Sequence, residues 1–77
     1  MSTAFVLINA ELGSEEEVLI AVKEIPEVAE AHMVYGVYDI IARVEAETQQ
    51  KLKDVVITKI RRLDKVRSTI TMICMES

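Results

Sequence analysis

The chain has 77 residues, 51% hydrophobic and 29% charged, which predicts one folded domain rather than two domains or a disordered segment. Its net charge of −4 argues against direct nucleic-acid binding, which needs a basic face. One cysteine and one histidine exclude an internal disulfide and a His/Cys zinc site, and the lack of a long apolar run or signal segment predicts a cytoplasmic protein without a membrane span, metal or cofactor.

The first predicted strand, Thr3–Asn9, is apolar on both sides, which predicts that both of its faces are covered. Ser14 followed by Glu17 forms a capping-box pattern, and three consecutive glutamates suit the positive end of a helix dipole. The first helix should run over Ser14–Glu24, because Pro26 disfavours helical geometry at the residue before it. Its predicted buried stripe consists of Val18, Ala21, Val22 and Ile25.

Two further strands, Val28–Tyr35 and Val37–Ala46, follow the first helix. The short connection around Gly36 predicts that they form an antiparallel hairpin. In Val37–Ala46, apolar residues alternate with a set that mixes apolar and charged residues. This alternation predicts that one face of the strand lies in the core.

Thr48 is expected to cap a second helix that ends near Arg62. The predicted buried stripe of this helix consists of Leu52, Val55, Val56, Ile60 and Leu63. Basic residues gather at its end, and we interpret them as a solvated helix terminus: Lys59, Arg61, Arg62, Lys65 and Arg67. Val66–Met75 is the last predicted strand.

The element order is therefore strand, helix, strand, strand, helix, strand within a single domain, residues 1–77. With right-handed crossovers, this order predicts an α+β, ferredoxin-like fold in which a four-stranded antiparallel sheet carries both helices on one face. Two helices leave the other face of the sheet open.

We expect Val6, Ile40 and Ile70 to face the helices, together with Ser68 and Cys74. The uncovered face should then carry Phe5, Leu7, Ile41 and Ile73. A bare apolar face predicts that two sheets pack together in a two-fold dimer, a dimeric α+β barrel. Scattered exposed hydrophobic residues are the alternative. Apolar residues outside the helix stripes suggest further contacts between dimers: Leu19, Ile20 and Ile57.

The segment Tyr35-Gly36-Val37-Tyr38-Asp39 is the first candidate for ligand binding. Glycine permits backbone angles that free N–H groups, a carboxylate can hold an ammonium group, and tyrosines offer flat walls. From spacing alone, an ordinary turn in which Asp39 bonds its own backbone is the favoured interpretation.

The second candidate is the pair Thr69 and Thr71, whose hydroxyls share one face of the last strand. The alternative is that threonine simply favours strands. His32 and Cys74 are the third candidate, as a base and nucleophile. A buried, inert thiol and a hydrogen-bonded surface histidine are favoured instead, so no catalytic residue is predicted.

The chain resembles the effector-binding domain of the Lrp/AsnC (feast/famine) transcription regulators. The residues that carry the resemblance are Ile25-Pro26-Glu27-Val28 with Ala31, Gly36-Val37-Tyr38-Asp39-Ile40, and Val66-Arg67-Ser68-Thr69-Ile70-Thr71. Two features depart from the family pattern. The helix-turn-helix segment of these regulators is missing, and Tyr35 stands where such loops commonly have a small polar residue.

The resemblance implies dimers that assemble into rings, often octamers, with an amino acid bound in clefts between dimers. It implies that Gly36–Asp39, Thr69 and Thr71 line the cleft, with Asp39 at the ammonium group and a threonine hydroxyl and the N–H near Gly36 at the carboxylate. A stand-alone sensing module of this kind would act on transcription through assembly with full-length regulators. Two alternatives stay open: a small dimeric enzyme of the monooxygenase or isomerase type, and an assembly module without a ligand.

Overall fold

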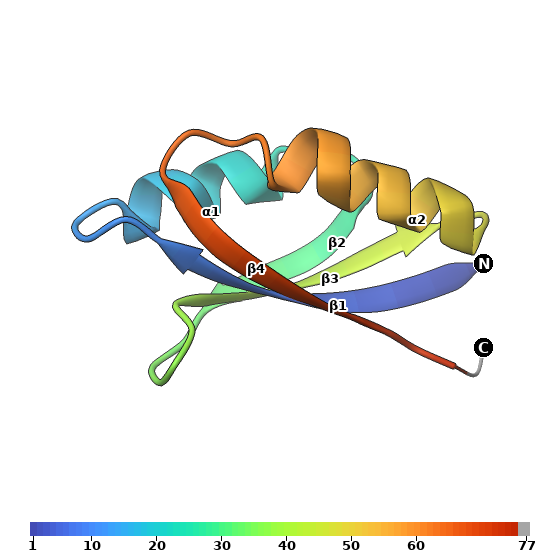
Figure 1. The fold of residues 1–77 in the computed structure, drawn as a ribbon, viewed down its shortest axis with the longest axis horizontal. Helices are drawn as coiled ribbons and strands as arrows, with labels where there is room; N and C mark the ends of the chain where they lie inside the picture. Colours follow the sequence, from blue (N-terminus) through green and yellow to red (C-terminus); the bar gives the residue numbers. More distant parts are fainter. Residues whose placement is uncertain (76–77) are drawn as a thin grey trace.

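The computed structural model describes residues 1–75 of the chain. Its elements are β1 (Ser2–Ala10), α1 (Glu15–Lys23), β2 (Val28–Met33), β3 (Ile40–Ala46), α2 (Gln49–Val55), η1 (Val56–Ile60) and β4 (Val66–Ile73). The sheet is antiparallel throughout, with the strand order β2-β3-β1-β4. Both helices lie over the same face of this sheet (Figure 1). The predicted ferredoxin-like α+β fold is confirmed. No helix within residues 1–75 is long and apolar enough to cross a bilayer.

The two helices begin in different ways. Thr48 Oγ1 accepts a hydrogen bond from the Lys51 N–H at 3.1 Å, which confirms the predicted cap of α2. The Ser14 side chain makes no such bond at the start of α1, so the predicted capping box does not form. At this start, the Ser14 carbonyl oxygen accepts a hydrogen bond from the Val18 N–H at 3.0 Å, and the Ser14 N–H donates to the Glu11 carbonyl at 2.8 Å.

The second helix is not a uniform α-helix. After Val55 it widens into η1, a π-helical turn in which the Arg61 N–H donates to the Val56 carbonyl at 2.8 Å. The predicted stripe nevertheless reaches the core, with Leu52 and Ile60 fully buried. On α1, Val18 and Val22 are likewise buried against the sheet.

The core lies between the helices and the inner face of the sheet. It consists of apolar side chains alternating along the strands, with the helix stripes above them: Ala4, Val6, Ile8, Ala10, Ala31, Ile40, Ala42, Val44, Ala46, Val18, Val22, Ile25, Leu52, Val55, Val56 and Ile60. Ser14 is the one buried polar residue among those that the structure describes.

The predicted orientation of the last strand is wrong. In β4, Thr69, Thr71 and Ile73 pair with Ile8, Val6 and Ala4 of β1, so their side chains share the helix-covered face. Ile70 and Met72 pair with Leu7 and Phe5 and lie on the open face. The sequence reasoning assigned the more apolar set of β4 to the core, but the open face is the more apolar side of this strand.

The open face therefore carries a larger apolar set than predicted: Phe5, Leu7, Ile41, Ile70 and Met72. Ile70 is 45% exposed and Met72 is 49% exposed in the single protomer. We call these five residues the open-face cluster. Exposed apolar residues gathered on one sheet face are typical of an interaction surface.

The connection between β2 and β3 is longer than predicted. β2 ends at Met33 and β3 begins at Ile40, which leaves residues 34–39 as a hairpin loop. The Val34 N–H donates to the Asp39 carbonyl at 2.8 Å and closes the base of the loop. Figure 1 shows the loop projecting from the sheet on the side away from the helices.

Candidate functional site

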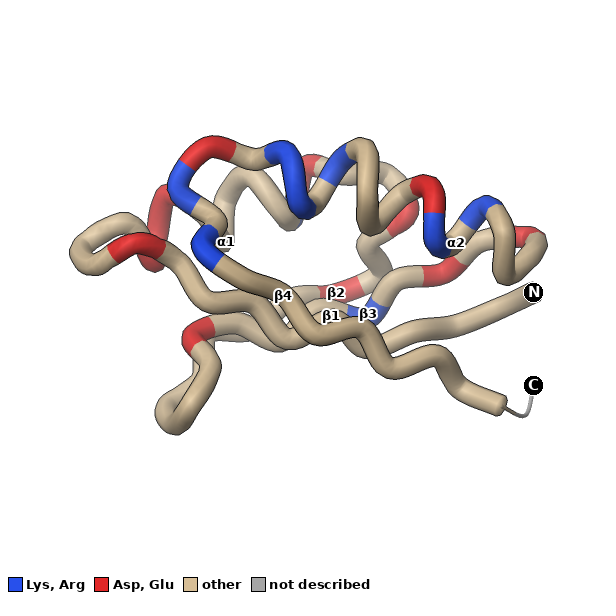
Figure 2. The backbone as a smooth tube through the Cα atoms, viewed as in Figure 1, with Lys and Arg blue, Asp and Glu red and all other residues tan. Residues whose placement is uncertain are grey.

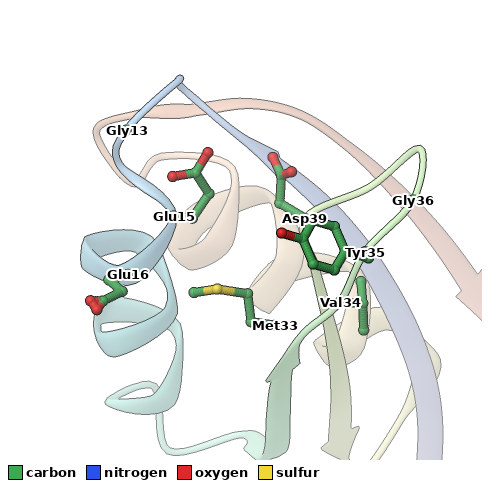
Figure 3. A pocket seen from close by; sticks show the side chains of 8 residues that line it. All are labelled: Gly13, Glu15, Glu16, Met33, Val34, Tyr35, Gly36 and Asp39. Atoms are coloured by element: carbon green, nitrogen blue, oxygen red, sulfur yellow. The ribbon is translucent and has the colours of Figure 1, made fainter.

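A pocket of about 700 Å³ opens between the hairpin loop and the start of α1. Residues from three segments line it: Gly13, Glu15, Glu16, Met33, Val34, Tyr35, Gly36 and Asp39 (Figure 3). Gly13 has a φ of 84°, a backbone angle that favours glycine and lets the chain turn from β1 into α1 at the rim of the pocket. The charged residues of this pocket are all acidic.

Asp39 is fixed in place by β1. Its Oδ2 accepts a hydrogen bond from the Ala10 N–H at 2.9 Å, and its own N–H donates to the Ile8 carbonyl at 3.0 Å. The expectation that Asp39 bonds its own turn is thus wrong in detail, because its side chain bonds the neighbouring strand. Within residues 1–75, Oδ1 takes no hydrogen bond from another protein group. Figure 3 shows the carboxylates of Asp39 and Glu15 toward the same end of the pocket.

The tip of the hairpin loop leaves backbone donors unused. The N–H groups of Tyr35, Gly36 and Val37 have no hydrogen-bond partner in the described part of the chain. Gly36 has a φ of 150°, and a Cβ built on it would meet no atom within 4 Å. These N–H groups are therefore available to an anionic ligand group.

The five predicted hairpin residues divide into two sets. Tyr35, Gly36 and Asp39 line the pocket, whereas Val37 and Tyr38 do not. Val37 is 84% exposed at the tip, and Tyr38 is half-buried. Tyr35 is fully exposed, so its ring is free to act as a wall of the pocket.

Thr69 and Thr71 lie elsewhere on the protomer. They border a groove of about 360 Å³ between β4 and the second helix, which is also lined by Lys53, Val56, Ile57, Arg61 and Ile73. A smaller hollow at the start of β4 is lined by Arg61, Val66, Arg67, Ser68 and Thr69. We call the two together the threonine groove. Because β2 and β4 are the two edge strands of the sheet, one protomer does not bring the hairpin and the threonines together.

Sequence reasoning missed the part of the pocket that comes from the β1–α1 connection. The sequence indicates Glu15 and Glu16 only as charges at the start of a helix, and it gives no sign that Gly13 belongs to a site. The sequence around these residues does not indicate that they lie near the hairpin, which is more than 15 residues away in sequence. Only the packing of α1 on β2 brings the two segments together.

The third candidate pair does not assemble. His32 lies on β2, at one edge of the sheet, and Cys74 follows β4, at the other edge. His32 Nε2 lies 2.9 Å from Glu30 Oε1, and Arg43 Nε donates to Glu30 Oε2 at 2.7 Å. Hydrogen bonds from His32 and Arg43 hold the pKa of Glu30 below its ordinary value. Cys74 is half-buried rather than buried.

Comparison with known proteins identifies the family. Residues 3–77 match the model of the Lrp/AsnC ligand-binding domain. The chain is 37% identical, over 94% of its length, to an uncharacterised HTH-type transcriptional regulator of Pyrococcus furiosus, and it spans about half the length of the curated relatives that it matches.

Two solved structures extend the likeness to three dimensions. A Thermus thermophilus protein is 36% identical, with a TM-score of 0.94 and coverage of 100% of this chain and 96% of the other. AsnC of E. coli is 27% identical, with a TM-score of 0.91, and is matched over 52% of its own chain.

A transcriptional regulator of Neisseria meningitidis, solved as a complex with L-Met, shares the fold alone, with 14% identity and a TM-score of 0.85. The family model covers nearly the whole chain, and the relatives are named as regulators rather than enzymes. The chain belongs to the Lrp/AsnC ligand-binding domain family.

Proposed function

We propose that this chain is an amino-acid-binding regulatory module that works as a homo-oligomer in the cytoplasm and modulates transcription through assembly with full-length Lrp/AsnC-type regulators. The observation that carries the proposal is the incomplete pocket at the hairpin. It offers carboxylates and free N–H groups but lacks hydroxyl and cationic side chains apart from the Tyr35 phenol, and such groups lie in the threonine groove at the opposite edge.

The first step of assembly is a dimer formed by two sheets. The open-face cluster would leave half-exposed side chains such as Ile70 and Met72 in water if the protomer stayed alone. Packing two such faces together in a two-fold arrangement removes this surface from water. It also leaves both sheet edges, and with them the pocket and the groove, at the outside of the dimer.

The ligand would then bind in a cleft between two dimers. Asp39 Oδ1 holds the ammonium group of the amino acid, since Oδ2 is committed to the Ala10 N–H. The N–H groups around Gly36 and a hydroxyl of Thr69 or Thr71 from the neighbouring dimer hold the carboxylate. Tyr35 narrows the pocket and limits the side chains that fit. The Neisseria meningitidis complex with L-Met supports the amino-acid class, because that regulator has this fold.

Calorimetry with each of the twenty amino acids at millimolar concentration tests the proposal, together with the solution mass measured with and without each ligand. We expect one or a few amino acids to bind and to shift the distribution of assembly sizes, because a ligand at a subunit boundary favours the state that completes its site. No heat from any amino acid, with assembly sizes unchanged, would leave a ligand-free assembly module as the better description.

A further inference from the structure

We infer that His32 makes the sheet-to-sheet dimer of this chain sensitive to protons, and that the dimer is tighter in mildly acidic solution than in alkaline solution. The inference rests on the dimer of the proposed function and adds a form of regulation to it that does not involve the amino-acid ligand. It comes from ionisable side chains that share the open face of the sheet with the open-face cluster.

The open face has an apolar half and a charged half. On β1 and β4, Leu7 pairs with Ile70 and Phe5 pairs with Met72, and all four belong to the open-face cluster. On β2 and β3, most side chains of this face are ionisable, and we call them the charged cluster: Glu30, His32, Arg43 and Glu45. In Figure 2, β1 carries no charged position, whereas acidic and basic positions lie on β2 and β3.

The strand register makes the two halves of the open face continuous. Arg43 pairs with Glu30 on one side and with Phe5 on the other. Ile41 likewise lies between His32 and β1. Neighbouring strands are only about 5 Å apart. A second sheet that covers Phe5 therefore comes close to the charged cluster as well.

Ion pairs inside the protomer hold the charged cluster together. His32 Nε2 lies 2.9 Å from Glu30 Oε1, and Arg43 Nε donates to Glu30 Oε2 at 2.7 Å. Arg43 also pairs with Glu45. The next strand, β1, places no ionisable side chain among these paired positions, and the helices cover the opposite face (Figure 1). A proton on His32 therefore acts first on Glu30.

The net charge of the cluster depends on one proton. Two carboxylates and one guanidinium leave an excess negative charge while His32 is neutral, and a protonated imidazole cancels this excess. A histidine ordinarily titrates at about pH 6.5. Hydrogen bonds from His32 and Arg43 hold the pKa of Glu30 below its ordinary value, so Glu30 stays ionised while His32 titrates.

Packing two sheets together makes an unbalanced charge costly. In a two-fold dimer the same face of each copy is covered, so both charged clusters lose water. A charge without an opposite partner is expensive to remove from water, whereas a balanced and hydrogen-bonded set is less so. Protonation of His32 thus favours the dimer, and by linkage the dimer favours the protonated imidazole.

Sedimentation equilibrium measures the dissociation constant of the dimer, without any amino acid and at constant ionic strength. We expect this constant to fall at least about threefold from about pH 8 to about pH 6, within the limit of about a hundredfold per pH unit for one proton taken up by each copy. The chain has one histidine, so its imidazole resonances are identified directly by NMR. They should titrate at a higher pH in concentrated samples, where dimers prevail, than in dilute samples.

Two substitutions separate this effect from a general effect of pH. His32→Gln cannot take up the proton, so the dissociation constant of its dimer should stay the same across the range. Glu30→Gln balances the cluster while His32 is neutral and gives it an excess positive charge when His32 is protonated. Its dimer should therefore weaken, rather than tighten, as the pH falls. Glu24→Gln is the matched control, because Glu24 follows α1 on the helix-covered side and should leave the response unchanged.

The inference is overturned if the dissociation constant of the unaltered chain does not change with pH, if the change survives in His32→Gln, or if Glu30→Gln still tightens on acidification. His32→Asn makes the same test if His32→Gln does not fold. A chain that stays a single protomer at every pH overturns both the inference and the proposed dimer. A pH-sensitive dimer that binds no amino acid contradicts the proposed function alone, and amino-acid binding with a flat pH profile contradicts the inference alone.

Discussion

The Asp39 carboxylate and the Ala10 N–H are joined by a hydrogen bond of 2.9 Å that ties the hairpin loop to the end of β1. Ala10 is 5% exposed, so its N–H would have little access to water without this partner. The same carboxylate has a second oxygen free for a ligand. One residue therefore has a structural contact and a proposed binding contact, and these two roles can be separated by mutation.

Asp39→Ala should lower the free energy of unfolding by about 1–3 kcal/mol, because it leaves the Ala10 N–H unsatisfied. Asp39→Asn keeps an oxygen acceptor and should recover most of that stability. It removes the charge, however, and should still weaken amino-acid binding. Denaturant unfolding and calorimetry on the two variants provide the comparison, and equal binding by Asp39→Asn and the unaltered chain would exclude the ammonium contact.

Leu7→Lys should convert the sheet dimer into single protomers, because it places a charge in the middle of the open-face cluster. Burying an unpaired charge is strongly unfavourable. Ile20→Lys is the control, since Ile20 is 61% exposed on α1 and lies away from the open face. Sedimentation or light scattering checks both variants. A dimer that survives Leu7→Lys would show that the sheets do not form its interface.

Thr48→Ala should cost about 1 kcal/mol, because it removes the side-chain cap of α2. Ser14→Ala should cost less, although the sequence pattern suggests an equivalent cap for α1. The Ser14 side chain makes no capping bond, and its carbonyl contact survives the substitution. Chemical denaturation of the two variants measures the difference, and a larger loss for Ser14→Ala would contradict the geometry at α1.

Glu27 should make the stability of the protein depend on pH in the acid range. Lys59 Nζ lies 3.0 Å from Glu27 Oε1 and holds the pKa of this carboxyl below the ordinary value of 4.5. A carboxyl whose pKa is lowered by folding stabilises the fold above its unfolded pKa, and this contribution disappears as the pH falls through the folded pKa.

The difference in Tm between the unaltered chain and Glu27→Gln should therefore be present near neutral pH and shrink below about pH 4. Glu24→Gln is the control, because Glu24 is exposed and forms no ion pair within residues 1–75. A Tm difference for Glu27→Gln that stays constant across this range would mean that the Lys59 contact does not stabilise the fold.

The sequence predicts the fold well where the alternation of apolar and polar residues along a strand is clear. In β3, buried Ile40, Ala42 and Val44 alternate with less buried neighbours, so the core face follows directly from a period of two. In β4 both faces carry residues suited to strands, and composition alone does not decide between them. The pairing of Val6 with Thr71 determines which face of β4 lies under the helices, and that pairing is a long-range contact.

The candidate site was predictable only where it comes from one segment. Tyr35, Gly36 and Asp39 are close in sequence, and their residue types suggest binding without knowledge of the fold. Glu15 and Glu16 join them through packing between elements, which a single sequence does not reveal. The placement of Thr69 and Thr71 at the far edge follows from the strand order, so their predicted role depends on a neighbouring copy.

The π-helical turn at Val56–Ile60 determines where the positive charge of Arg61 points. In a regular α-helix each residue advances by about 100° around the axis. If the same residues wound as a regular α-helix instead, the turn would hold one residue fewer and every later side chain would be rotated by about that angle. Arg61 would then leave the threonine groove without any change in its own identity. The surface that this helix presents to its surroundings is thus encoded partly in the length of one turn.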